Sequence, residues 1–108
     1  MIEAAVFRAL ADPTRRAVYE RLAGREMSVS ELKAGFAISQ PAISQHLAAL
    51  RGAGLVRERR QGRHAYYRID PRGLAPLVDW IDRYRAFWPK RIEKLKDVLK
   101  GMEPWPAA

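Results

Sequence analysis

Small polar side chains on one predicted helix carry the clearest chemistry in this sequence. Between Ser39 and Leu50 the chain contains Gln40, Ser44 and Gln45, and this segment has no acidic side chain. Glutamine pairs well with adenine, serine hydrogen-bonds to several bases, and an alanine methyl group contacts the methyl group of thymine. A merely solvated helix face is usually filled with lysine and glutamate instead. The segment therefore predicts a helix that reads base edges in the major groove of DNA.

The start, register and end of this helix follow from local signals. Ser39 is typical of an N-cap, and Pro41 suits the first turn because it lacks an amide that would have no partner there. Apolar residues at positions 43, 47 and 50 predict one buried stripe, and Gly54 predicts the helix end. The face away from the stripe then carries Pro41, Ala42, Gln45, Ala48 and Ala49, with Gln40 and Ser44 on its flank. We predict DNA contacts from this helix at Ser39, Gln40, Pro41, Ala42, Ser44, Gln45 and His46.

A charged hairpin is predicted directly after this helix. Residues 55–60 and 64–69 have the pattern of two strands, and Gln61-Gly62-Arg63 between them places a glycine in the turn. The five cations in or beside this turn are Arg57, Arg59, Arg60, Arg63 and His64, and the single acid is Glu58. This number of cations exceeds what an edge strand needs to prevent aggregation. Arginines at a hairpin tip suit the phosphate backbone or the minor groove. The predicted DNA contacts of this wing are Arg59, Arg60, Arg63 and His64.

The elements that position this helix precede it. Residues 2–10 are predicted to form a first helix. Asp12 and Pro13 are typical of the N-cap and first residue of a second helix, which is predicted to end at Gly24. Ser30 is predicted to cap a third helix, which pairs with the reading helix as a helix-turn-helix. We therefore expect a mainly α fold with a small β-hairpin, a winged helix-turn-helix.

The longest helical stretch is predicted from Asp70-Pro71 to about Lys100. Apolar residues recur along it at intervals of one, three and four, which makes one continuous stripe. A domain of this size cannot cover such a stripe with its own helices, so the stripe predicts a partner, most simply a second copy of the chain. Pro89 lies inside the stretch and either kinks it near Arg85 or divides it into two helices.

Length and composition indicate one globular domain with a polyanionic partner. The chain has 108 residues, 48% of them hydrophobic, and a formal net charge of +8 at pH 7. We expect a DNA-binding and dimerisation domain over residues 1–101 and an irregular tail over residues 102–108. No run is long enough to span a membrane, so we expect no membrane partner and a cytoplasmic protein associated with the nucleoid. The absence of cysteine excludes disulfides, thiolate metal sites and cysteine nucleophiles.

These residues also carry a resemblance to a known family. Residues 10–16, 30–32, 38–47, 54–56 and the wing of residues 60–67 resemble the ArsR family of bacterial winged-helix repressors, and the block 38–47 is the most specific part. The family implies a homodimer that binds an imperfect palindrome in a promoter and blocks transcription. By position, it implies base reading by Gln40, Pro41, Ala42, Ser44 and Gln45, the face already predicted above.

The resemblance also implies a dimer interface formed by the first and last helices. We expect this interface to contain Val6, Phe7, Leu77, Ile81, Tyr84, Trp88, Ile92 and Leu95. Members that sense metals carry cysteines in the third helix, or Asp and His ligands along the last one. This chain has neither arrangement, so we expect no metal and no cofactor, as in the subgroup without a metal site. The inducing signal stays open between another protein, a small organic ligand and none.

The same residues bear on three other classes of function. No histidine or serine forms a catalytic constellation with an acid at a recognisable spacing, so we expect no enzyme. A sequence-independent architectural protein would need only the net charge. A protein-docking winged helix would need apolar anchors on the reading helix in place of Ser, Gln and Ala. The ratio of operator affinity to random-DNA affinity separates specific regulation from the architectural alternative.

Overall fold

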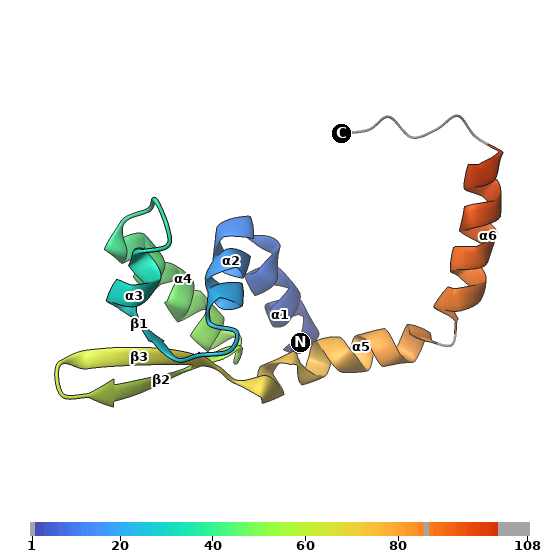
Figure 1. Cartoon of the computed structure of the whole chain (residues 1–108). Coiled ribbons are helices and arrows are strands. Elements are labelled where there is room, and N and C mark those ends of the chain that lie inside the picture. Colours follow the sequence, from blue (N-terminus) through green and yellow to red (C-terminus); the bar gives the residue numbers. More distant parts are fainter. Residues whose placement is uncertain (1, 86, 102–108) are drawn as a thin grey trace. The chain divides into compact units, whose positions relative to one another are not determined.

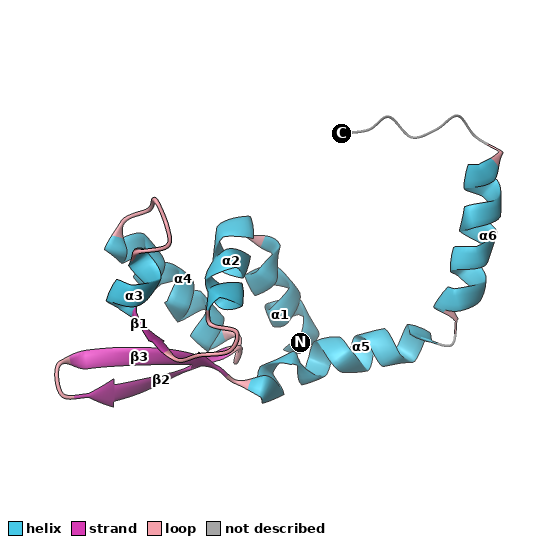
Figure 2. Ribbon diagram, viewed as in Figure 1, coloured by secondary structure: helices cyan, strands magenta, loops and turns pink. Residues whose placement is uncertain are grey.

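The computed structural model of the chain describes residues 2–85 and 87–101, and the side chains of residues 2, 3 and 88 lie outside that description. The predicted tail of residues 102–108 and the predicted interface side chain of Trp88 therefore lie outside the described part. The predicted winged helix-turn-helix fold is confirmed (Figures 1 and 2). The elements are α1 (Ile2–Ala11), α2 (Pro13–Arg21), β1 (Met27–Ser28), α3 (Val29–Lys33), α4 (Gln40–Gly52), β2 (Val56–Gln61), β3 (His64–Ile69), the 3-10 turn η1 (Pro71–Leu74), α5 (Ala75–Arg85) and α6 (Trp88–Lys100).

The chain divides after Val78 into two compact units. In the first, buried aliphatic side chains from α1 to α4 and the start of the wing form one core: Val6, Ala9, Val18, Leu22, Met27, Leu32, Ile43, Leu47, Leu50, Leu55 and Val56. Val6 is 0% exposed, which corrects its predicted place in the dimer interface, because a fully buried side chain offers no surface to a partner. Its role is to anchor α1 to the core.

The N-cap of α2 is the residue that the sequence predicts, whereas the N-cap of α3 is a different residue from the predicted one. The Asp12 side chain accepts from the Arg15 backbone N–H at 3.0 Å, and this bond is the first cause of the lowered pKa of Asp12. The helix after it ends at Arg21, three residues before the predicted end. The prediction that Ser30 caps α3 is wrong: Ser28 is the N-cap, because Glu31 completes a reciprocal capping box with it.

The sheet has three strands, one more than the predicted hairpin. Strand order is β1-β3-β2, and both pairs are antiparallel. The added strand β1 has only two residues, Met27 and Ser28, which pair with Tyr67 and Tyr66. Strand β1 thereby connects the segment just before α3 to strand β3 of the wing.

The predicted long C-terminal helix is divided. Asp70 caps η1 through a bond from the Arg72 backbone N–H, α5 ends at Arg85, and α6 begins at Trp88. Pro89 lies in the first turn of α6, where its missing amide leaves no intrahelical bond unmade. Of the two predicted effects of Pro89, the division into two helices is the observed one. No helix in the described part of the chain has the length and apolar character needed to cross a membrane.

Candidate nucleic-acid interface

Helix α4 has the start, register and end that its sequence predicts. The Ser39 hydroxyl accepts from the Ala42 backbone N–H at 3.2 Å, and Pro41 lies in the first turn. The stripe of Ile43, Leu47 and Leu50 is fully buried, which fixes the rotation of the helix about its axis. Gly54 has a φ of 78° and terminates the helix as predicted, since this backbone region favours glycine.

The polar residues predicted to read DNA lie on the exposed face of α4. Ser39, Gln40, Pro41, Ser44 and Gln45 are exposed, and Ala48 continues this face by one turn. Three other residues of the helix, Ala42, His46 and Ala49, are half-buried. These exposures leave serine and glutamine side chains free to meet base edges, with alanines that let the helix approach closely.

His46 differs from the exposed reading residues in its surroundings. Its Nδ1 atom is inaccessible to solvent and has no hydrogen-bond partner among the described residues. Its charge also contributes to lowering the pKa of Asp12, after the larger effect of the Arg15 backbone bond. His46 therefore faces the start of α2 as well as the surface, and its contact with DNA stays a prediction.

The wing is a tight antiparallel hairpin. Gln61 pairs with His64, so Gly62 and Arg63 form a two-residue turn, and Gly62 has a φ of 61°. A positive φ at the first turn position is what a type II′ hairpin requires, and glycine adopts it without strain. The turn places Arg63 at the tip, with His64 opening the returning strand.

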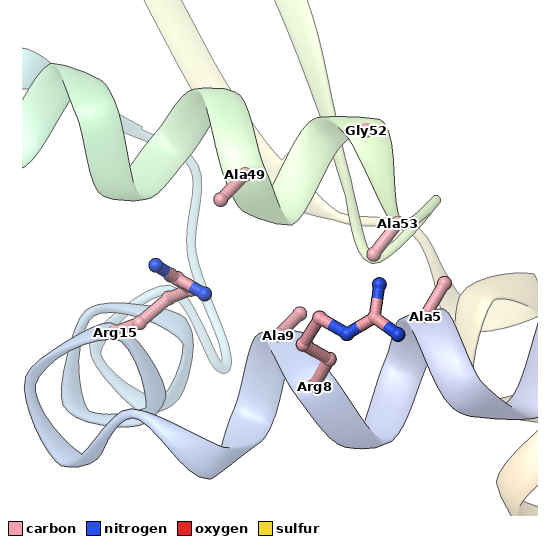
Figure 3. A pocket seen from close by; sticks show the side chains of 7 residues that line it. All are labelled: Ala5, Arg8, Ala9, Arg15, Ala49, Gly52 and Ala53. Atoms are coloured by element: carbon pink, nitrogen blue, oxygen red, sulfur yellow. The ribbon is translucent and has the colours of Figure 1, made fainter.

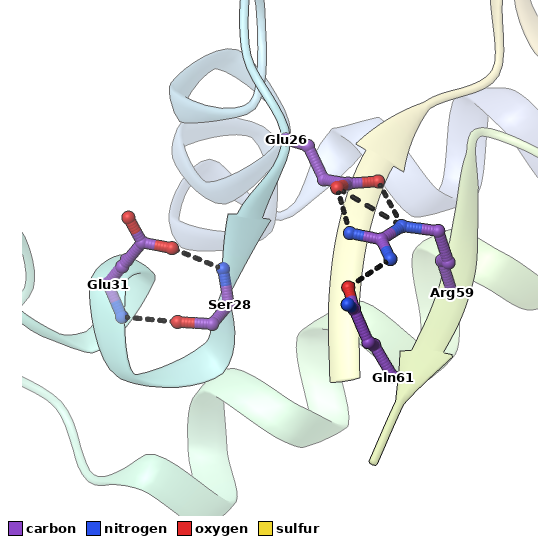
Figure 4. A network of polar contacts seen from close by, with 5 residues as sticks. All are labelled: Glu26, Ser28, Glu31, Arg59 and Gln61. Carbon is purple, nitrogen blue, oxygen red and sulfur yellow. Dashed lines mark hydrogen bonds and ion pairs between the residues drawn. The ribbon is translucent and has the colours of Figure 1, made fainter. Parts of the chain in front are cut away.

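Arg59 is the wing cation most engaged within the chain (Figure 4). Its Nε and Nη2 donate to the Glu26 carboxylate, with a shortest distance of 2.6 Å, and its Nη1 donates to Gln61 at 2.7 Å. The guanidinium also lies 4.8 Å from the ring centroid of Tyr66. The hydrogen bond from Arg59 lowers the pKa of Glu26. Arg59 thus joins the wing to the segment before β1, and any DNA contact it makes competes with Glu26.

The acid of the wing, Glu58, is paired with side chains from three elements, α4, β2 and β3. The Tyr67 hydroxyl donates to the Glu58 carboxylate at 2.6 Å, while Arg60 and Arg51 each lie 3.2 Å from it. The pKa of Glu58 is lowered, first by the hydrogen bond from Tyr67 and then by the arginines. Because Arg51 belongs to α4, this cluster connects the reading helix to the wing and reduces repulsion of phosphate.

Arg63 and His64 meet the beginning of the reading helix. A recess of about 190 Å³ is lined by Ser28, Val29, Ser30, Gln40, Arg63, His64 and Ala65. Among the described residues, no hydrogen bond or ion pair occupies the Arg63 guanidinium, and both wing residues are exposed. The structure therefore brings Gln40, which carries the amide chemistry, next to a free cation of the wing tip.

Sequence reasoning missed the residues that hold this arrangement together. Glu26, Arg51 and Tyr67 each contact a wing side chain, and Glu26 is 33 positions away from Arg59 in the sequence. No local pattern indicates a pair so far apart. The capping box of Ser28 and Glu31 did have a signal, since a serine followed three residues later by glutamate is its signature (Figure 4). No group of three or more metal-ligating side chains occurs in the described part of the chain.

Known proteins are similar to this chain in sequence and in fold. A domain family described as "Helix-turn-helix domain" matches residues 10–59. The "HTH-type transcriptional regulator Rv2034" of Mycobacterium tuberculosis (strain ATCC 25618 / H37Rv) is 45% identical over 86 residues, which are 80% of this chain and 78% of that protein. The "Transcriptional repressor SdpR" of Bacillus subtilis (strain 168) is 36% identical over 76 residues, 70% of this chain and 84% of that one.

A solved structure agrees with these relatives. The "ArsR-like Transcriptional Regulator from Rhodococcus sp. RHA1" has a TM-score of 0.71 and is 33% identical in sequence. The match covers 94% of this chain and 95% of that chain. It therefore extends beyond the helix-turn-helix and includes most of both units.

Proposed function

The chain belongs to the ArsR family of winged helix-turn-helix DNA-binding regulators, and we propose that it represses transcription by binding a palindromic operator as a homodimer. The observation that carries the proposal is the recess shared by Gln40, Arg63 and His64. It supports a division of labour in which the amide and hydroxyl face of α4 reads bases while the wing tip contacts the adjacent backbone.

The charge distribution supports DNA as the partner. The chain carries 20 Lys and Arg against 12 Asp and Glu, and the wing acid Glu58 is already paired with Arg51 and Arg60. A surface of this kind attracts phosphate through release of bound counterions. The reading face itself lacks large apolar anchors, so a protein-docking role has no support from α4.

Exposed apolar side chains support self-association. In α6, Ile92, Leu95 and Leu99 recur on one face and are 46%, 55% and 45% exposed. In α1, Phe7 is 41% exposed. Large apolar patches of this kind mark interaction surfaces, and the simplest partner with a complementary stripe is a second copy. A two-fold dimer would place its reading helices in successive major grooves, about 34 Å apart.

The proposed regulator has no thiolate metal site. The chain contains no cysteine, and its two histidines lie in α4 and at the wing tip. We infer that release from DNA depends on a signal other than a metal held by cysteines. The proposal includes no catalytic step.

The dimeric mode is tested with a two-fold operator and a matched DNA in which one half-site is scrambled. The proposal predicts one dimer per intact operator and a large loss of affinity for the scrambled DNA. Sedimentation without DNA tests the interface: Leu95→Asp is expected to give monomers, whereas Lys96→Asp, which places the same acid one position along α6, is expected to stay dimeric. A monomer that binds both DNAs equally would overturn the proposal.

A further inference from the structure

A second recess lies in the first unit, between the first two helices and the last turn of α4 (Figure 3). Its volume is about 200 Å³, and its lining is Ala5, Arg8, Ala9, Arg15, Ala49, Gly52 and Ala53. Apart from the half-buried Ala49 at the end of the α4 face, none of these residues belongs to the predicted DNA interface. The recess combines two cations with walls made of alanine and glycine.

The two arginines are free to bind an anion. Figure 3 shows the Arg8 guanidinium extending from α1 toward Ala53, and the Arg15 guanidinium extending toward α4 near Ala49. Neither guanidinium has a hydrogen bond or an ion pair in the part of the chain that the structure describes. The neighbouring Arg16 shows the ordinary structural use of such a side chain, since it donates to the Leu10 carbonyl at 2.8 Å.

Arg15 supplies the stronger indication. Its Nε atom is inaccessible to solvent and lacks a hydrogen-bond partner among the described residues. Buried polar groups in folded proteins are nearly always satisfied, and a guanidinium matches a carboxylate through two parallel hydrogen bonds. Arg15 lowers the pKa of Asp12 through its backbone N–H and more weakly through its charge, yet its guanidinium forms no ion pair with that acid.

The walls define the rest of the ligand. Ala5, Ala9 and Ala53 present methyl groups and add no hydrogen-bonding side chain. The volume lies below the roughly 300–1,000 Å³ of sites for drug-sized ligands. A small organic molecule with an apolar part and one or two carboxylates fits both the methyl groups of the walls and the two arginines better than an inorganic anion does.

We propose that this recess binds a small organic carboxylate, and that the bound carboxylate weakens the affinity of the chain for its operator. The first half stands on the recess alone, whereas the second half rests on the proposed DNA-binding function. The connection is α4 itself: Ala49, Gly52 and Ala53 in the recess belong to the end of the helix whose first two turns read DNA. A carboxylate inserted between α1 and this end of α4 displaces the helix. If the carboxylate binds the displaced position more tightly, it lowers the affinity for DNA, and bound DNA lowers the affinity for the carboxylate by the same factor.

Binding is tested without DNA, by NMR titration of the full chain with acetate, benzoate and phenylacetate. Benzamide serves as the uncharged counterpart of benzoate, and inorganic phosphate as an anion without an apolar body. We expect saturable shifts at the amides of Ala5, Ala9 and Ala49 with the aromatic carboxylates and much weaker ones with benzamide and phosphate. Shifts with no carboxylate, or equal shifts with benzamide or phosphate, would overturn the site.

Variants assign the binding to the two arginines. Arg8→Gln and Arg15→Gln are each expected to weaken benzoate binding by about tenfold or more, because each removes a charged hydrogen bond. Arg25→Gln removes the same charge from an arginine that pairs with Glu31 outside the recess, and it is expected to leave the affinity for benzoate unchanged. Arg15→Lys keeps the charge without the planar fork and is expected to bind with intermediate affinity, should Arg15→Gln fail to fold.

Regulation is tested by operator affinity with and without saturating benzoate. We expect a loss of about fivefold or more in the wild type and none in Arg15→Gln. Unchanged operator affinity with benzoate bound would overturn the regulatory half. If both arginine variants weaken DNA binding without any ligand, the recess is a DNA phosphate contact and the carboxylate site is wrong. If the wild type binds no DNA specifically, the proposed function fails, while the NMR result still decides the site.

Discussion

Two arginines of the wing differ in what they contact, and this difference predicts responses of different size to the same substitution. Arg63 lies at the exposed tip beside Gln40 and is not engaged by the described residues, whereas Arg59 is held by Glu26 and Gln61. Arg63→Ala should therefore weaken binding to operator and random DNA alike. Arg59→Ala also removes one positive charge but should weaken DNA binding less than Arg63→Ala does, because the Arg59 guanidinium is held by Glu26 and its loss adds only the repulsion of the unpaired Glu26 carboxylate.

The size of the Arg63 effect follows from counterion release. Each phosphate contact contributes a slope of about −0.9 to log K against log salt, which at about 0.15 M salt corresponds to about fivefold in affinity. In a dimer with two such contacts, Arg63→Ala should flatten the slope by about 1.8 and weaken binding by about thirtyfold.

Fluorescence anisotropy across a salt series measures both the slope and the affinity. Arg59→Ala provides the control for lost charge, and the unfolding free energy of each variant confirms that the wing is intact. An unchanged slope in Arg63→Ala would refute the assignment of the tip. A slope change in Arg59→Ala as large as that in Arg63→Ala would refute the reasoning from the Glu26 pair.

Three further results are expected. Gln45→Ala should relax base preference by about 1–3 kcal/mol in competition between operator variants, since its exposed amide is placed to read an adenine; an unchanged preference means that α4 is oriented differently. Ser28→Ala should lower the unfolding free energy by about 1 kcal/mol through loss of the N-cap, measured by denaturant titration, whereas Ser30→Ala should cost less; equal losses would contradict the cap assignment. Because the folded pKa of Glu58 lies below its ordinary 4.5, its stabilising effect is present above that value and is lost as the pH falls through the folded pKa. Tyr67→Phe removes the first cause of that shift, so the loss of stability on acidification should shrink, and an unaltered pH profile would argue against the bond.

Local signals in the sequence predicted the reading helix. Ser39 as N-cap, the stripe of Ile43, Leu47 and Leu50, and Gly54 at the end act within one or two turns, so the residues alone specify them. The exposed amide face of α4 follows directly from that register.

Long-range pairing explains what the sequence did not reveal. Strand β1 is too short for a recognisable alternation and exists because Tyr66 and Tyr67 pair with it. The contact of Glu26 with Arg59 joins distant segments, so nothing near Arg59 distinguishes it from Arg63. By periodicity, Val6 fits an interface stripe and a core stripe equally well. The packing of α1 against the other helices places it in the core.

Recognition of a specific DNA sequence by this chain is tested by a comparison of affinities. Purified protein is titrated at near-physiological salt against fragments of its own promoter region and against random DNA of equal length. We expect a preference of about a thousandfold or more for one fragment, as specific regulators show. Equal affinity for all promoter fragments and random DNA, followed by no enriched sequence in a genome-wide selection of bound fragments, would contradict it.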